Sequence, residues 1–179
     1  MTIPLDVRDL IGHPGDSRDV HLAEPVAGLA TELASVPEDR TLAVDLVLES
    51  VVEGVLVSGR LTGVVVGSCA RCLMAFEQPF DVPVQELFAP GAEPDDEHEY
   101  PLVEGHLDLE PMIRDAVVPS LPFAPLCRPD CLGLCERCGG NRNLGECACP
   151  PETTDVRWSA LASLSLEPAE GAGGDARSG

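Results

Sequence analysis

Six cysteines lie close together near the carboxy-terminal end of this 179-residue chain. They are Cys127, Cys131, Cys135, Cys138, Cys147 and Cys149. Cys135-x-x-Cys138 followed by Gly139-Gly140 has the form of a zinc knuckle, because a two-residue gap lets both sulfurs face one ion and glycines let nearby amides point at the thiolates. Cys147 and Cys149 can complete a tetrahedral shell. We therefore expect one zinc ion, structural rather than catalytic, since four thiolates leave no position for water.

Other uses of these thiols stay open. Disulfides would need an oxidising compartment, and no signal in the sequence directs the chain to one. An iron–sulfur cluster also takes four thiolates, but the spacing does not match the ferredoxin runs. The choice of ligands is open too, because Cys127 and Cys131 could replace the pair Cys147 and Cys149. Alternatively, they are a reduced, packed pair without metal.

A separate C-x-x-C stands far from this segment, at Cys69-Ala-Arg-Cys72. A thioredoxin-type redox pair would need a following helix to lower the pKa of the first thiol, whereas a strand pattern follows here. Two packed thiols at a bent strand end are the favoured interpretation, and a half-site that joins the distant zinc cluster is the alternative. The four histidines show no ligand or triad spacing, so we expect no enzyme and no catalytic residue.

The composition favours a β-rich core. Hydrophobic residues make up 44% of the chain but aromatic residues only 3%, so Val, Leu and Ala must fill the interior. Near-alternating, β-branched segments predict a hairpin and then an antiparallel meander, over residues 42–51, 55–61, 62–68 and 74–88. Pro79 and Pro83 each remove a ladder donor and predict an edge or a broken strand for the last of these.

Asp108 is a good N-cap, and apolar residues follow it at helical spacing from Leu109 to Val117. We therefore expect an α+β fold: an antiparallel β meander or partly open barrel with one or two packed helices and a C-terminal cysteine-rich zinc-knuckle segment. The expected organisation is a β-rich core over 1–126 with a helix near 109–118, a zinc-binding segment over 127–150, a docking helix over 151–166 and a disordered tail over 167–179.

The charge is strongly acidic. Thirty-one acids face eleven bases, all of them arginine, for a net charge of −20. Ten acids and no arginine fall between Asp81 and Glu110, and positive charge shows little segregation along the chain. Such a field repels phosphate backbones and attracts basic partners. No amino-terminal signal is visible, and no apolar run approaches the roughly 20 residues that cross a bilayer. We expect a cytoplasmic protein without membrane contact.

Several motifs together resemble one family. They are Cys69-x-Arg-Cys72-Leu73, Asp108-Leu-Glu, Cys127-x3-Cys131-x-Gly-Leu-Cys135-x2-Cys138-Gly-x-Asn141, Cys147-x-Cys149 and Arg157-Trp158-x-Ala-Leu161. This combination resembles the YceD family, whose members are named for accumulation of the large ribosomal RNA subunit, over roughly residues 3–165. One departure lies at Gly140-Asn-Arg-Asn143, where the family usually reads closer to Ala-Asn-Leu-Asn.

The resemblance implies a role in producing or stabilising large-subunit (23S) ribosomal RNA and supplies no catalytic residue. Members are commonly encoded beside a small zinc-ribbon protein of the large subunit. With the acidic charge, this predicts a non-enzymatic ribosome biogenesis factor that binds a basic ribosomal protein or an assembly intermediate, with only indirect contact to ribosomal RNA.

Two alternatives to that prediction stay open. A direct RNA-binding module would need arginines clustered on one face, namely Arg60, Arg71, Arg128, Arg137 and Arg142. A zinc-thiolate redox sensor would need a thiol of low pKa.

Overall fold

The computed structural model describes residues 2–92, 99–150, 157 and 161. Strands are the main regular element of the described chain. The strands are β1 Pro4–Asp6, β2 Ser17–Glu24, β3 Ala34–Ser35, β4 Leu42–Ser50, β5 Val55–Ser68, β6 Ala75–Ala89, β7 Glu99–Val103 and β8 His106–Asp108. One α-helix, α1, spans Leu109–Ser120, and one short 3-10 helix, η1, spans Arg142–Leu144.

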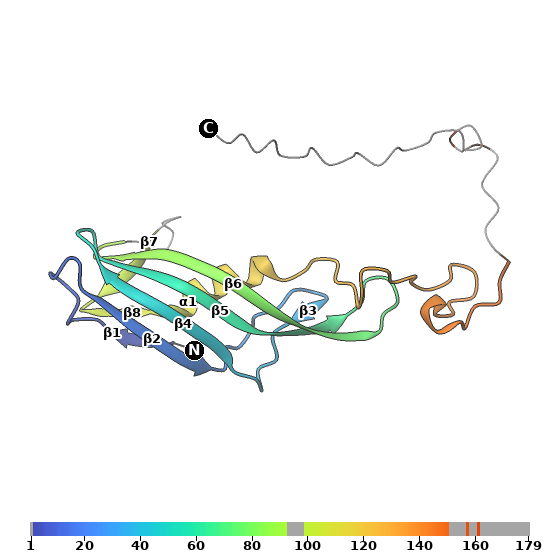
Figure 1. Ribbon diagram of the computed structural model, residues 1–179, viewed down its shortest axis with the longest axis horizontal. Coiled ribbons are helices and arrows are strands. Elements are labelled where there is room, and N and C mark those ends of the chain that lie inside the picture. Colours follow the sequence, from blue (N-terminus) through green and yellow to red (C-terminus); the bar gives the residue numbers. More distant parts are fainter. Residues whose placement is uncertain (1, 93–98, 151–156, 158–160, 162–179) are drawn as a thin grey trace, which may run out of the picture.

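The strands form one sheet in the order β1-β8-β7-β6-β5-β4-β2, with β3 paired to β5. The sheet curls into a half-barrel around α1, so the expected α+β class holds in its broad outline (Figure 1). The longest strands, β5 and β6, pair as a hairpin from Val55↔Phe88 to Ser68↔Ala75. The far tip of this hairpin extends beyond the helix-covered body toward the cysteine-rich segment (Figure 1).

The sheet departs from a simple meander in three ways. Residues 55–68 form one 14-residue strand rather than two, because Gly63 does not turn the chain but gives room to the Phe80 ring. β7 runs parallel to β6, against the antiparallel expectation. β2, which pairs with β4, is a strand that the sequence patterns did not indicate, since its polar residues mask the alternation.

Pro79 and Pro83 lie within β6 without breaking it. Both pair with β5, and β6 has its second neighbour, β7, only at Leu87–Ala89. The prolines therefore stand where β6 is an edge strand, and a missing N–H costs no ladder bond on the open side. The prediction of an edge strand is confirmed for this stretch.

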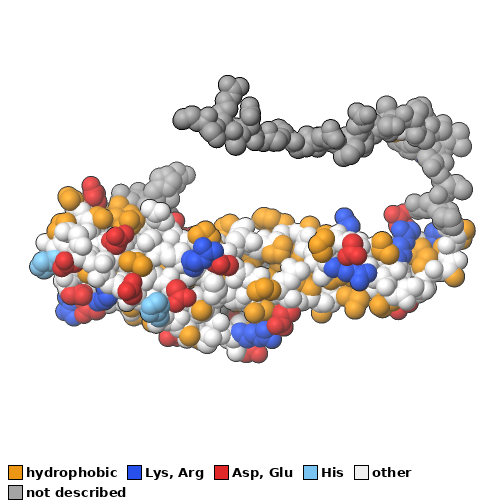
Figure 2. Space-filling view, in the orientation of Figure 1, with side chains coloured by type: hydrophobic (Ala, Val, Ile, Leu, Met, Phe, Trp, Pro, Cys, Tyr) orange, Lys and Arg blue, Asp and Glu red, His pale blue; other side chains and the backbone are white. Residues whose placement is uncertain are grey.

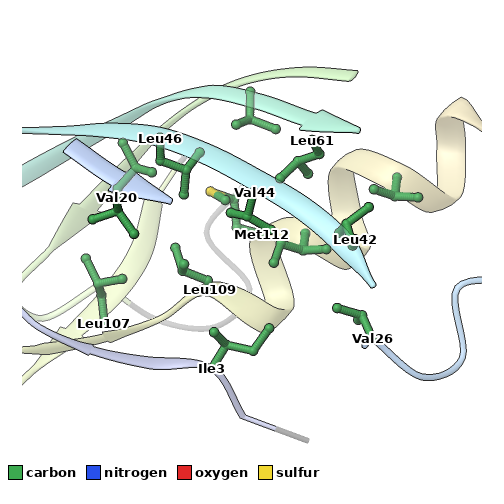
Figure 3. Close-up of a cluster of buried hydrophobic side chains, with 14 of the residues drawn as sticks. Ile3, Val20, Val26, Leu42, Val44, Leu46, Leu61, Leu107, Leu109 and Met112 are labelled. Atoms are coloured by element: carbon green, nitrogen blue, oxygen red, sulfur yellow. The ribbon is translucent and has the colours of Figure 1, made fainter. Parts of the chain in front are cut away.

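The core lies between the sheet and α1. Alternate residues of β4 point inward, where Leu42, Val44 and Leu46 are at most 1% exposed. They contact the buried face of α1, which includes Leu109 and Met112 (Figure 3). This alternation is the reason that the strand needs no aromatic residue to fill the interior.

Asp108 caps the helix and also ties it to the amino-terminal segment. Its carboxylate accepts the N–H of Glu110 at 3.1 Å and the N–H of Ile3 at 2.8 Å. The helix expected near 109–118 runs to Ser120, with Pro119 in its last turn.

The docking helix expected over 151–166 and the tail expected over 167–179 lie outside the described residues, apart from Arg157 and Leu161. Among the described helices, none has the length and apolar character needed to cross a membrane.

Gly59, in the middle of β5, tests the close packing of β4 against β5. A Cβ at this position would lie 2.1 Å from the carbonyl oxygen of Asp45, so Gly59→Ala must push β4 and β5 apart. We expect a loss of about 1–3 kcal/mol in the free energy of unfolding, measured by denaturant titration at constant zinc. The neighbouring Ser58→Ala is the control and should change stability by less than about 0.5 kcal/mol.

Candidate metal centre

The eight cysteines are free thiols and gather into two groups of four. The Cys69 group comprises Cys69, Cys72, Cys127 and Cys131, and the Cys135 group comprises Cys135, Cys138, Cys147 and Cys149. Within each group all four sulfurs lie within 4.8 Å of one another. Four thiols that converge in this way are a donor set for a tetrahedral metal ion such as zinc.

The four ligands preferred from the sequence lie together in the Cys135 group. Cys127 and Cys131, considered as substitutes for Cys147 and Cys149, lie elsewhere, because they face the tip of the β5–β6 hairpin. Cys69 and Cys72 are therefore not an isolated pair of packed thiols, and they do not join the knuckle. A single metal site accounts for only half of the cysteines.

The hairpin tip places the first two sulfurs of the Cys69 group. The Leu73 N–H donates to the Cys69 carbonyl at 2.9 Å, and the Cys69 N–H donates to the Met74 carbonyl at 2.9 Å. Leu73 has φ 60°, a left-handed conformation that closes the tight turn after Cys72. The turn aims both thiols at the segment that follows α1.

That segment is tied to the tip by hydrogen bonds at several points. Arg71 makes two of them, since its carbonyl accepts the Leu134 N–H at 3.1 Å and its Nη1 donates to the Cys131 carbonyl at 3.0 Å. Two further bonds join Ala70 N–H to Pro125 O at 2.8 Å and Gln78 Nε2 to Leu126 O at 3.1 Å. These bonds hold Cys127 and Cys131 opposite the hairpin thiols.

The Cys69 group is enclosed. Cys69 is 0%, Cys131 2% and Cys72 4% exposed, and Leu126 and Leu134 pack around them. The Cys69 and Cys131 sulfurs are 3.7 Å apart, and those of Cys72 and Cys127 are 3.6 Å apart. These distances far exceed a disulfide bond of about 2.05 Å.

The Cys135 group is built on a local turn and is more open. The Gly139 N–H donates to the Cys135 carbonyl at 2.8 Å, with Gly139 in the left-handed region at φ 71°. A Cβ at Gly140 would lie 2.9 Å from the Glu146 carbonyl oxygen, so glycine is needed there. Cys138 is exposed, and a hollow of about 420 Å³ adjoins the group.

Two asparagines in the loop of the Cys135 group organise both groups. Asn141 caps η1 by accepting the Asn143 N–H at 3.0 Å. Asn143 accepts the Leu132 N–H at 2.9 Å and donates through Nδ2 to the Cys131 sulfur at 3.4 Å. Neither residue was assigned a role from the sequence, although Asn141 ends the motif that resembles the family and Asn143 lies in the segment that departs from it.

Backbone amides favour charge on particular sulfurs. Burial raises the pKa of Cys69, but the N–H groups of Cys127, Cys72 and Arg71 outweigh it and lower that pKa to about 6. The N–H of Cys138 and a hydrogen bond to Cys147 lower the pKa of Cys135 to about 6.

Their neighbours behave in the opposite way. Burial raises the pKa of Cys127 to about 12. Hydrogen bonds with the thiols of Cys138, Cys147 and Cys135 raise the pKa of Cys149 to about 12. Four thiolates so close together repel one another, and a divalent cation is the natural counter-charge. The thiols of low pKa, Cys69 and Cys135, are at most 4% exposed, whereas reactive sensor thiols are accessible. This combination favours ligands over a redox sensor.

Positive charge is segregated in the folded chain, contrary to the expectation from the linear sequence. We define the cysteine end as residues 69–74 and 122–150; it carries four arginines and three acids. The rest of residues 1–121, here called the body, carries five arginines and twenty-three acids, a formal charge of −18. Figure 2 shows basic side chains on the cysteine end of the visible face. Arg60 lies apart from them and pairs with Asp81 at 2.6 Å.

Comparison with known proteins identifies the family. The model of the family described as "Large ribosomal RNA subunit accumulation protein YceD" matches residues 57–165. The chain belongs to the YceD family. The matched range includes both C-x-x-C motifs and all the cysteines of the two groups, so the candidate metal centre lies wholly inside the family region. The family's name suggests a role in accumulation of the large ribosomal RNA subunit.

Relatives in this family are similar over most of the chain or over part of it. An uncharacterized protein of Mycobacterium tuberculosis is 37% identical over 173 residues, covering 89% of this chain and 80% of the relative. One of Mycobacterium leprae is 34% identical, covering 90% and 77%. A chloroplastic YCED homolog 1 of Zea mays, named as a large ribosomal RNA subunit accumulation protein, is 34% identical over 58 residues, covering 32% and 20%. No solved structure matches the chain significantly.

The bridging role of Asn143 is testable by limited digestion with trypsin, which cleaves after arginine in this lysine-free chain. Asn143→Ala removes the contacts to Leu132 and Cys131 and should speed cleavage after Arg137 by roughly fivefold, as expected for a loss of about 1 kcal/mol. Leu144→Ala, a change at an adjacent exposed side chain, is the control and should leave the cleavage rates unchanged. Equal rates in all three proteins would contradict the bridging role.

Proposed function

We propose that this protein is a non-enzymatic ribosome biogenesis factor that supports accumulation of large-subunit (23S) ribosomal RNA by holding a basic ribosomal protein or an assembly intermediate. The family membership supports the process, and the charge distribution supports the kind of partner. The proposed location is the cytoplasm, where ribosomal subunits are assembled.

The observation that carries the proposal is the acidic surplus of the body. Each of its five arginines forms an ion pair with a carboxylate of the body. The body has eighteen further acids, and this excess of carboxylates creates a field of one sign, which attracts a basic partner and speeds its encounter. Like charges on one surface repel one another and do not stabilise the fold, so the surplus charge is better explained by binding than by folding.

The outward face of the sheet offers a surface for such a partner. Asp19, Asp45 and Glu49 are exposed on β2 and β4, on the side opposite the buried residues that contact α1. Asp45 also holds His21, with its Oδ1 2.7 Å from the His21 Nδ1. Lysine and arginine side chains of a ribosomal protein could reach these carboxylates without any rearrangement of the core.

We assign a structural zinc ion to the Cys135 group. The support is the converging set of four sulfurs and the amides directed at Cys135. Four thiolates close the coordination shell, so the ion would organise the loop that carries Asn141 and Asn143 rather than activate water.

Direct contact with ribosomal RNA is a second candidate, favoured by the clustered arginines of the cysteine end. Arg137 and Arg142 line the hollow beside Cys135, and exposed Leu132 and Leu144 lie in the same part of the chain. However, each zinc ion with four thiolates adds about −2, which outweighs the formal +1 of this end. The balance of charge therefore keeps the protein partner in first place.

Affinity capture of the tagged full-length chain from cell lysate tests the first candidate. At moderate salt we expect recovery of a basic large-subunit protein or an assembly particle, and a several-fold loss with the double variant Asp19→Asn, Glu49→Gln. The double variant Arg137→Gln, Arg142→Gln is the matched control and should retain the protein partner. Recovery of ribosomal RNA without any basic ribosomal protein would contradict the proposal.

A salt series of filter-binding measurements with large-subunit ribosomal RNA tests the second candidate. Phosphate contact predicts a steep fall of affinity with salt, with a log–log slope of about −0.7 per contact for single strands. The double variant Arg137→Gln, Arg142→Gln should then reduce the slope by about 1 to 2, while the double variant Asp19→Asn, Glu49→Gln should leave the slope unchanged. Affinity that is absent, or independent of salt, would exclude direct binding through this end.

A further inference from the structure

We infer that the Cys69 group is a second zinc site, separate from the Cys135 group, and that its ion joins the tip of the β5–β6 hairpin to the segment after α1. This inference concerns the chain's own architecture and does not depend on the proposed ribosomal partner.

The distances between the sulfurs suit a tetrahedral ion. With Zn–S bonds of about 2.3 Å, the edge of a regular tetrahedron of sulfurs is about 3.8 Å. The Cys69–Cys131 and Cys72–Cys127 pairs, at 3.7 Å and 3.6 Å, lie close to that edge, and each pair takes one sulfur from the hairpin and one from the segment. An ion at the centre would therefore be bound equally by both parts of the chain.

Two of the four sulfurs, those of Cys69 and Cys131, receive N–H groups from the surrounding chain. The N–H groups of Cys72 and Arg71 point at the Cys69 sulfur, and the Gly133 N–H and the Asn143 side chain point at the Cys131 sulfur. Amide donors directed at sulfur are the usual outer contacts of a zinc-bound thiolate. Four thiols packed only by hydrophobic contact would not need N–H donors directed at their sulfurs.

The Cys69 group is a bridge between distant parts of the chain, whereas the Cys135 group is local. In the Cys69 group, Cys69 and Cys131 are 62 residues apart in the sequence, and Cys72 and Cys127 are 55 residues apart. Residues 122–134 contain no helix or strand, and they are held to the hairpin by the hydrogen bonds of Arg71, Ala70 and Gln78 and by the packing of Leu126 and Leu134. A metal ion at this joint would close a long loop, which is where a cross-link restricts the unfolded chain most.

The two sites differ in access, which predicts two rates of metal loss. Three sulfurs of the Cys69 group belong to residues at most 4% exposed, whereas Cys138 is exposed and the Cys135 group borders an open hollow. A chelator should reach the Cys135 group without opening the fold. Release from the Cys69 group requires the hairpin tip to part from the segment, and should be roughly tenfold slower or more.

Elemental analysis of the full-length protein, purified under reducing conditions and saturated with zinc, tests the inference. We expect two zinc ions per chain, and one in each of the variants Cys127→Ser and Cys147→Ser. Ser68→Ala, next to Cys69 but not a ligand, is the control and should retain two. One ion per chain in the wild type, unchanged by Cys127→Ser, would overturn the second site, and iron in the Cys69 group would overturn its assignment to zinc.

Hydrogen exchange of the same proteins separates the bridge from a merely local site. Cys127→Ser should raise exchange by at least about tenfold both at the hairpin tip, residues 69–74, and in residues 125–134. Cys147→Ser should raise it in residues 135–149 and at the Leu132 N–H, which Asn143 holds, but not at the hairpin tip. Exchange in Cys127→Ser that rises in the segment alone, with the tip still protected, would contradict the bridge.

If Cys127→Ser fails to fold, cadmium substitution of the wild type supplies the second test. Two cadmium resonances in the range of all-thiolate coordination support two separate sites, and a single resonance overturns the inference. If the full-length protein retains both ions but captures no ribosomal partner from lysate, the proposed function is contradicted and the second site still holds.

Discussion

The structure depends on one meeting point, where the tip of the β5–β6 hairpin faces the segment that leaves α1. Four sulfurs converge there, and Arg71 binds Leu134 and Cys131 across the junction. The long hairpin alone would end in solvent, and the cysteine-rich segment has almost no regular structure of its own. The hairpin tip and the segment after α1 thus position each other. The Cys135 group follows directly after this junction in the chain.

This arrangement separates two chemical characters along one molecule. The body buries an aliphatic core under α1 and presents a surplus of carboxylates. The cysteine end presents arginines and exposed leucines, including Leu73 at 66% and Leu132 at 61% exposed. Exposed apolar side chains beside arginines are typical of binding surfaces. The joint therefore brings a second kind of surface to a chain that is otherwise uniformly acidic.

Local sequence patterns were reliable where the structure is local. The alternation in β4 and the N-cap at Asp108 follow from neighbours a few residues away, and the edge position of Pro79 agrees with the missing N–H of proline itself. They failed where pairing is long-range: the parallel contact of β6 with β7 depends on a connection whose path no periodicity encodes. β2 was not predicted because the polar residues of its exposed face obscure the alternation with its buried residues.

The residue types along the chain already indicate the donor chemistry, since eight cysteines and the Gly139-Gly140 turn favour a thiolate metal site. The sequence also indicates the local knuckle, because the sulfurs of Cys135 and Cys138 are set by a turn of four residues. The folded arrangement was needed to show that Cys127 and Cys131 belong with Cys69 and Cys72, and that the arginines gather at one end. The reason is physical: such contacts are made by folding β5 and β6 into a long hairpin, and spacing along the chain carries no record of them.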